Sequence, residues 1–248
     1  RYGGGRTRCS LDAMTTQSDT SLEALLEDCP GLLISREEED LRAYGLDWTR
    51  FYEPAPLAVA FPRSVEEVQA LVRWANASRV ALVPSGGRTG LSGGACALKG
   101  EVVVSFERMN KILDFNPVDR LVVCQAGVVT EALQAYAAEQ GLLYPVDFAA
   151  AGSSQIGGNI ATNAGGIKVI RYGMTRQWVA GLKVVTGAGE ILELNQGLVK
   201  NNTGYDLRHL FVGSEGTLGL IVEATMRLTT KAPPSAVLVF GVPSMSAV

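Results

Sequence analysis

The sequence has one histidine and four cysteines in 248 residues, and both shortages exclude classes of function. His209 stands alone, and Cys9, Cys29, Cys96 and Cys124 form no C-x-x-C pair. Zinc sites need three or four clustered ligands, so no metal site is predicted in this chain. Four scattered cysteines are typical of reduced thiols and favour a cytoplasmic protein, although the spacing leaves one disulfide open.

Long apolar runs and dense positive charge are also scarce. Apolar stretches such as residues 219–222 are far too short to span a bilayer, so the protein is not predicted to be transmembrane. Lysine and arginine total 22 against 25 aspartates and glutamates, which gives a formal net charge of −3. Without a basic stripe or an arginine-rich run, no nucleic-acid partner is expected.

Two common nucleotide-binding signatures are missing. No G-x-G-x-x-G motif follows a predicted strand, which disfavours a Rossmann site. No glycine–lysine–Ser/Thr sequence occurs, which excludes a Walker phosphate loop. A phosphate ligand of this protein must therefore be bound in another way.

Glycine, in contrast, is abundant, with 28 residues. It gathers in three stretches at element junctions: "PSGGRTGLSGGA" at 84–95, "AAAGSSQIGGNIATNAGG" at 149–166 and "GSEGTLG" at 213–219. Each alone is compatible with an ordinary turn, but all three are too long for simple turns. Loops without side chains let main-chain N–H groups approach an anion directly. The three stretches together predict an extended dinucleotide.

The remaining pattern mixes helices and strands. Ser64 and Glu67 have the spacing of a capping box before a helix at 64–78, and Thr130 and Gly141 have the character of a helix cap and stop. Further helices are predicted at 21–28 and 202–211, strands at 30–35, 79–83, 101–106, 120–127 and 218–234, a hairpin at 181–194, and almost no regular structure at 149–166. Strict β-α-β alternation is absent, which indicates an α+β fold.

The two ends of the sequence differ from its middle. Residues 1–13 have no helical or strand period, and Met14 opens an ordinary protein start. We interpret 1–13 as an upstream or disordered segment, with a short targeting arm as the alternative. At the other end, residues 236–248 have the pattern of a strand followed by the start of a helix. That pattern predicts a further domain, absent from this sequence.

Five segments carry a family resemblance. They are "PRSVEEVQALVRWAN", "VPSGGRTGLSGGA", "GSSQIGGNIATNAGG", "VIRYGMTRQWVAGLKVV" and "NNTGYDLRHLFVGSEGTLG". In this order, over residues 43–234, they resemble the PCMH-type FAD-binding domain of the vanillyl-alcohol-oxidase superfamily. Within it they are similar to the D-2-hydroxyacid dehydrogenase branch, which includes D-lactate dehydrogenases and the glycolate oxidase flavin subunit. The segment "AYGLDWTRFYEPAPLAVAFPRS" is most similar to bacterial D-2-hydroxyglutarate dehydrogenases.

The resemblance implies a two-subdomain α+β fold with FAD between the subdomains. It predicts an N-terminal helical extension at 14–54, FAD-binding subdomains at 55–118 and 119–230, and the start of a truncated C-terminal substrate (cap) domain at 231–248.

The resemblance also assigns the cofactor-binding residues. They are Pro84, Ser85, Gly86, Gly87, Arg88, Thr89, Gly90, Leu91, Ala151, Gly152, Ser153, Ser154, Gln155, Gly157, Gly158, Asn159, Thr162, Asn163, Glu215, Gly216, Gly219 and Ile221. Some superfamily members carry a histidine that bonds covalently to the flavin where this sequence has Arg88. The FAD is therefore expected to be non-covalent.

The activity implied by the resemblance is oxidation of a D-2-hydroxyacid by hydride transfer to flavin N5, with D-2-hydroxyglutarate and 2-oxoglutarate as the favoured pair. Electrons would pass to an acceptor such as an electron-transfer flavoprotein or a quinone, and a homodimer is a further expectation. The family's substrate-binding cations, its base and a metal ion such as zinc come mainly from the substrate domain. No catalytic residue is therefore assigned here, and this chain alone is expected to be inactive.

Two alternatives remain. The chain could be a stand-alone or truncated FAD-binding module without turnover of its own. It could also belong to a UDP-sugar reductase or another oxidase on the same flavin domain, which the "NNTGYDL" and "RYGMTR" wording disfavours.

Several residues have both a functional and a structural interpretation. His209 could be a base, although a structural histidine is the favoured interpretation. Arg171 and Tyr172 could face the flavin or serve the fold, and Arg88 could add charge to a phosphate cradle or point to solvent. The acidic run at 36–40 is interpreted as a solvated face.

Overall fold

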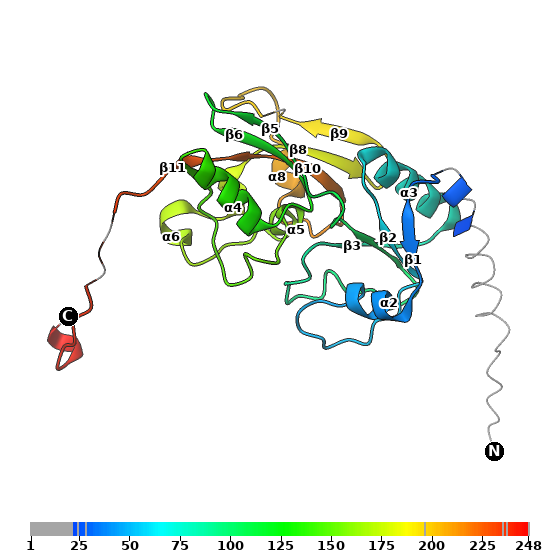
Figure 1. The fold of residues 1–248 in the computed structure, drawn as a ribbon, viewed down its shortest axis with the longest axis horizontal. Helices are drawn as coiled ribbons and strands as arrows, with labels where there is room; N and C mark the ends of the chain where they lie inside the picture. The colour runs from blue at the N-terminus through cyan, green and yellow to red at the C-terminus, as the bar shows by residue number, and fades with distance from the viewer. Residues whose placement is uncertain are drawn as a thin grey trace, which may run out of the picture.

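The computed structural model describes residues 22–23, 25–27, 29–195, 197–234, 236 and 238–247, and it places two β-sheets next to each other (Figure 1). The first sheet has the order β1-β2-β4-β3, with β1 at Leu33–Ser35, β2 at Ala58–Phe61, β4 at Val102–Ser105 and β3 at Leu82–Ser85. The second has the order β5-β6-β10-β8-β9, with β5 at Ile112–Asn116, β6 at Leu121–Gln125, β10 at Gly219–Arg227, β8 at Val179–Thr186 and β9 at Ile191–Leu194. β7 (Leu142–Leu143) and β11 (Thr229–Thr230) pair beside it.

The centre of the first sheet is parallel and covered on both faces. β4 pairs in parallel with β2 and with β3, whereas β1 is antiparallel to β2 at the edge. All four residues of β2 and all four of β4 are buried. Continuous apolar strands of this kind are typical of parallel sheets that are shielded on both faces.

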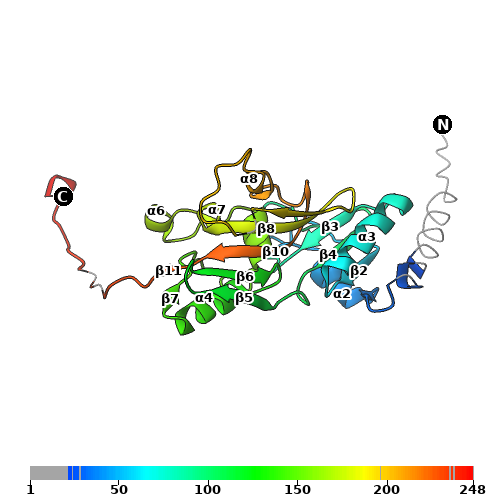
Figure 2. The same ribbon diagram turned by 90° about the horizontal axis from the view of Figure 1, so that it is seen from above.

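The second sheet is antiparallel throughout. Buried and partly exposed residues alternate along the second half of β10, the pattern of a sheet with one covered face. The predicted hairpin at 181–194 is confirmed as β8 and β9. Seen from above, the second sheet continues along the long axis from the first (Figure 2).

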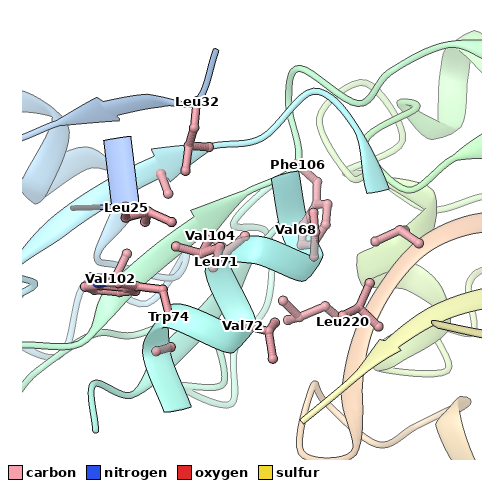
Figure 3. Close-up of a cluster of buried hydrophobic side chains, with 14 of the residues drawn as sticks. Leu25, Leu32, Val68, Leu71, Val72, Trp74, Val102, Val104, Phe106 and Leu220 are labelled. Atoms are coloured by element: carbon pink, nitrogen blue, oxygen red, sulfur yellow. The ribbon is translucent and has the colours of Figure 1, made fainter. Parts of the chain in front are cut away.

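Helix α3 (Val65–Ser78) lies in a buried cluster that includes residues of both sheets. Val68, Leu71 and Trp74 lie in the cluster that covers the first sheet, and Val72 points toward Leu220 of β10 (Figure 3). The predicted Ser64 cap is confirmed, because its hydroxyl accepts the N–H of Glu67 at 3.2 Å. The Glu67 carboxylate instead accepts the N–H of Arg63 at 2.7 Å, so the return half of the capping box is displaced by one residue.

The other helices are short: α2 (Glu38–Tyr44), α4 (Thr130–Glu139), α5 (Ile156–Ala161), α6 (Val169–Tyr172), α7 (Thr175–Trp178), α8 (Arg208–Phe211) and the 3₁₀ turn η1 (Met245–Ala247). Thr130 was predicted to be the cap of α4, and this is wrong. It is the first helical residue, and its hydroxyl bonds to Ser154. The stretch 149–166 was predicted to have almost no regular structure, but it contains α5. Its small residues give no helical period of apolar side chains.

The membership of two strands shows where the chain passes from one sheet to the other. β1, within the predicted helical extension, completes the first sheet, and β5, within the predicted first subdomain, pairs with β6 of the second. The chain therefore passes from the first sheet to the second between Ser105 and Ile112, and the subdomain bounds stay a prediction.

The described residues at the C-terminal end add little to this core. Among the described residues beyond 234, no strand forms where the sequence predicts one, since no neighbouring strand supplies hydrogen bonds there. Residues 1–13 lie outside the described residues. No helix of the described part has the length and apolar character needed to cross a membrane.

Candidate functional site

A cavity of about 400 Å³ lies where the ends of β3 and β10 meet α5. All three predicted glycine-rich stretches contribute to its wall: residues 84–95, here called the first loop, residues 150–166, the second loop, and residues 215–221, the third loop. This size is in the range of small-molecule sites. The tertiary fold therefore brings together segments that lie more than a hundred residues apart.

The first loop exposes main-chain donors. It leaves β3 at Ser85, and Arg88 takes a left-handed conformation with φ of 55°. In the part of the chain that the structure describes, no acceptor binds the main-chain N–H groups of residues 87–92. A run of N–H groups without protein acceptors is a ready site for phosphate oxygens.

The second loop is held from below by buried side chains. The amide of Asn159 donates to Thr130 Oγ1 at 2.6 Å, and the Thr130 and Ser154 hydroxyls lie 2.7 Å apart. All three residues are almost fully buried. This network links α5 to the start of α4. The cavity wall here is therefore held by hydrogen bonds between neutral, buried side chains.

The glycines of the two loops have different physical roles. A Cβ at Gly87 would lie 2.0 Å from the carbonyl oxygen of Ser153, so Gly87 is needed for the two loops to pack. A Cβ at Gly158 or at Gly90 would meet no protein atom within 4 Å. Gly158 and Gly90 line the cavity, and the space beside them is therefore available to a ligand.

The third loop closes the wall between the other two. The N–H of Glu215 donates to the carbonyl of Ala161 at 2.9 Å, and a Cβ at Gly216 would lie 2.5 Å from Pro84. The Glu215 carboxylate reaches the first loop, where a Cβ at Gly94 would lie 3.1 Å from its Oε2. The three loops thus form one continuous surface.

Two buried polar atoms on this wall have no hydrogen-bond partner among the described residues. They are Oγ of Ser85 and Oε1 of Gln155, in side chains that are 0% and 7% exposed. Buried polar atoms are rarely left unsatisfied in folded proteins. A polar ligand in the cavity would supply the missing partners.

Charged groups surround the first loop. The Arg88 guanidinium lies 4.2 Å from the centre of the Tyr44 ring, a cation–π contact that holds it at the cavity. The Tyr44 hydroxyl donates to Glu107 at 2.6 Å; burial and this contact raise the pKa of Tyr44 to about 12. Arg88 therefore adds one fixed positive charge to the wall.

Most of the predicted cofactor residues line this cavity: Pro84, Ser85, Gly86, Gly87, Arg88, Thr89, Gly90, Leu91, Gln155, Gly157, Gly158, Asn159, Thr162, Glu215, Gly216, Gly219 and Ile221. The structure places Ala151, Gly152, Ser153, Ser154 and Asn163 outside the lining. Ser154 instead bonds to Thr130, and the carbonyl of Ala151 accepts the N–H of Glu131, so these residues support the second loop from behind.

Sequence reasoning missed several cavity residues. Asp47, Phe106, Ala126 and Phe148 lie on the wall, brought there from separate segments. Phe106 directly follows β4, and Ala126 directly follows β6, so the ends of predicted strands were a usable signal. Nothing in the local pattern around Asp47 indicates that it reaches the first loop.

The other candidate residues lie elsewhere. His209 contacts Arg176 at 2.9 Å and Asp206 at 3.4 Å; burial, Arg176 and Arg208 lower its pKa against the opposing effect of Asp206. Tyr172 carries Arg171 over its ring and accepts the Trp178 indole N–H on its carbonyl. None of these side chains lines the cavity, and within the described ranges no three histidine, cysteine or carboxylate groups gather as for a metal ion.

Comparison with known proteins identifies relatives for almost the whole chain. It is 65% identical to a D-2-hydroxyglutarate dehydrogenase of Xanthomonas citri and 63% identical to one of Stutzerimonas stutzeri, over 92% of this chain and 48% of each relative. A mitochondrial D-2-hydroxyglutarate dehydrogenase of Bos taurus is 41% identical over 93% of this chain and 42% of that protein. The chain therefore spans about half the length of these curated relatives.

A solved structure shares the fold. An alkyldihydroxyacetonephosphate synthase superposes with a TM-score of 0.75 at 26% identity, over 84% of this chain and 40% of that one. The family model described as the FAD binding domain matches residues 56–195, which include the first two loops. The chain belongs to the FAD-binding-domain family.

Proposed function

We propose that the cavity binds FAD non-covalently and that the chain is the FAD-binding part of a dehydrogenase of D-2-hydroxyacids. The first loop would hold the diphosphate through the N–H groups of residues 87–92, with Arg88 as a nearby cation. Gln155 and Ser85 would satisfy their buried oxygens on polar atoms of the cofactor. The open space beside Gly90 and Gly158 would accommodate its close approach.

One observation carries this proposal. The run of unoccupied N–H groups, the two unsatisfied buried oxygens and the open space beside the glycines all lie on a single wall. A core that packs only against itself would not leave these features together.

The relatives favour D-2-hydroxyglutarate as the substrate and 2-oxoglutarate as the product, because two bacterial D-2-hydroxyglutarate dehydrogenases are 63–65% identical to this chain. Bound FAD would supply the acceptor for the substrate's hydride. An electron-transfer flavoprotein or a quinone would take the electrons onward, and the cytoplasm is the proposed location.

We further propose that the chain by itself does not turn over. The ionisable side chains on the described cavity wall are Asp47, Arg88 and Glu215. Asp47 and Arg88 are already engaged by protein groups. Oxidation of a hydroxyacid needs a cation for the substrate carboxylate and a base for its hydroxyl proton, and this wall offers no such free pair.

An absorbance spectrum of the purified chain, before and after addition of FAD and removal of excess, tests the first part. Retention of flavin by folded protein supports it, and its absence at saturating FAD contradicts it. Dye reduction with D-2-hydroxyglutarate tests the second part. Rapid reduction by the FAD-loaded chain would show that the catalytic groups lie within these 248 residues.

A further inference from the structure

The segment between α2 and β2 lies across the first loop and is bonded to it. We call residues 45–53 the strap. The Trp48 N–H donates to the carbonyl of Gly90 at 3.1 Å, and just beyond the loop the N–H of Ala97 donates to the carbonyl of Gly45 at 3.0 Å. The strap precedes the part of the chain that matches the family. It nevertheless holds the loop that the proposed function needs.

Asp47 is the buried centre of this contact. Its side chain is 5% exposed, and its Oδ2 accepts the N–H of Gly93 at 2.9 Å. Its Oδ1 accepts the N–H of Thr49 at 2.9 Å and the Thr49 hydroxyl at 2.5 Å. Each carboxylate oxygen is therefore used, one within the strap and one on the first loop.

The charge of Asp47 is stabilised by these donors. Burial raises the pKa of its carboxyl, but hydrogen bonds from Thr49, Gly93 and Arg50 outweigh burial, and the net effect lowers the pKa. The nearby Cys96 has its pKa raised, first by burial, so its thiol stays protonated beside the carboxylate. Asp47 is ionised at neutral pH and bonded on both oxygens.

The position of Gly93 explains why this bond matters. β3 fixes one end of the first loop at Ser85, and the Asp47 bond fixes the other end at Gly93, whose φ is 83°. Between these two points lie the N–H groups of residues 87–92, which have no acceptor among the described residues. The Asp47 bond, together with the Trp48–Gly90 bond, therefore restrains the direction of these donors.

We propose that Asp47 is a positioning residue that holds the first loop in its anion-binding conformation. This role rests on the proposed function. Asp47 does not bind the diphosphate itself, since its oxygens are taken by Thr49 and Gly93. It acts through the main chain of the loop, from a segment of the chain that precedes the family domain.

The test compares FAD binding by the wild-type chain, Asp47→Ala and Asp47→Asn, with Asp119→Asn as the matched control on an exposed turn of the second sheet. Quenching of flavin fluorescence gives each Kd. Loss of the charged acceptor is expected to raise the Kd for FAD by about 10- to 100-fold in Asp47→Ala. Asp47→Asn keeps one acceptor oxygen and should show a smaller rise, and Asp119→Asn should match the wild type.

Two further readouts separate positioning from general destabilisation. ADP, used as a competitor, shares the diphosphate, so its Kd should rise by the same factor as that of FAD. Amide hydrogen exchange, measured at saturating FAD so that the cofactor protects the N–H groups of residues 87–92, should accelerate there in Asp47→Ala, with residues 156–161 of the second loop unchanged. If Asp47→Ala does not fold, Asp47→Asn is measured in the same three ways.

The outcomes are distinguishable. A wild-type chain that does not bind FAD contradicts the proposed function and this role together. A wild-type chain that binds FAD while both Asp47 variants keep its affinity within about twofold, less than the net effect of one hydrogen bond, overturns the role of Asp47 alone. Equal acceleration of exchange in both loops also overturns it, because the effect would then be on the whole fold.

Discussion

The first and second loops line the same cavity but are held in place by different kinds of contact. The first loop is fixed from outside by an ionised carboxylate, Asp47, and by the Tyr44 ring beneath Arg88. The second is fixed from inside by the neutral network of Thr130, Ser154 and Asn159. The first should therefore respond to pH and to changes in the strap, and the second to changes in the core.

The largest expected effect breaks the contact between the two loops. Gly87→Ala places a methyl group 2.0 Å from the Ser153 carbonyl oxygen, which neither backbone can avoid without shifting. We expect a loss of about 3 kcal/mol or more in the free energy of unfolding, or insoluble protein. Urea denaturation measures it. Gly90→Ala, in the same loop with no atom within 4 Å, is the control and should keep wild-type stability.

Removal of the core network is next in size. Asn159→Ala deletes the donor to Thr130 and leaves a buried hydroxyl pair with one partner fewer. The free energy of unfolding should fall by about 1–3 kcal/mol, measured by chemical denaturation. Alanine at the exposed Asn110 should change it little. Equal losses at both positions would mean that the network does not hold the second loop.

A smaller effect separates ligand binding from stability. Gly158→Ala adds a methyl group to α5 that meets no protein atom, so the apo chain should gain about 0.5–1 kcal/mol from helix propensity. The same methyl group enters the cavity, and the affinity for FAD should fall. Thermal unfolding of the apo chain and a fluorescence titration with FAD measure the two changes. Unchanged affinity would show that the cofactor does not approach Gly158.

The smallest expected effect is the pH dependence of the first loop. Because the pKa of Asp47 is lowered in the folded chain, its contribution to stability is present above the unfolded-state pKa, about 3.9, and is lost as pH falls below it. The stability difference between wild type and Asp47→Asn should shrink on acidification through this range. The difference between wild type and Asn159→Ala should stay constant, since that network has no ionisable group. Thermal unfolding midpoints from pH 6 to pH 3 measure both.

The sequence predicted the elements whose signals are local. The apolar stripe and Ser64 cap of α3, the β8–β9 hairpin and the glycine-rich stretches are confirmed as elements of the fold or parts of the cavity wall. It missed α5, because "IGGNIA" has too few apolar residues for a helical period, and it missed β5, which pairs with β6. The strand expected near residue 238 has no partner among the described residues and does not form.

The sequence alone determined that long glycine-rich segments would present main-chain groups to a ligand, because residues without side chains leave the backbone accessible whatever the fold. Only the tertiary structure decided which cavity glycines have open space beside them and which pack against protein, since Gly87 and Gly158 are alike in the sequence and differ in their neighbours. It also decided that Asp47 bonds to the first loop. A hydrogen bond between segments far apart in the sequence produces no local residue pattern from which it could be predicted.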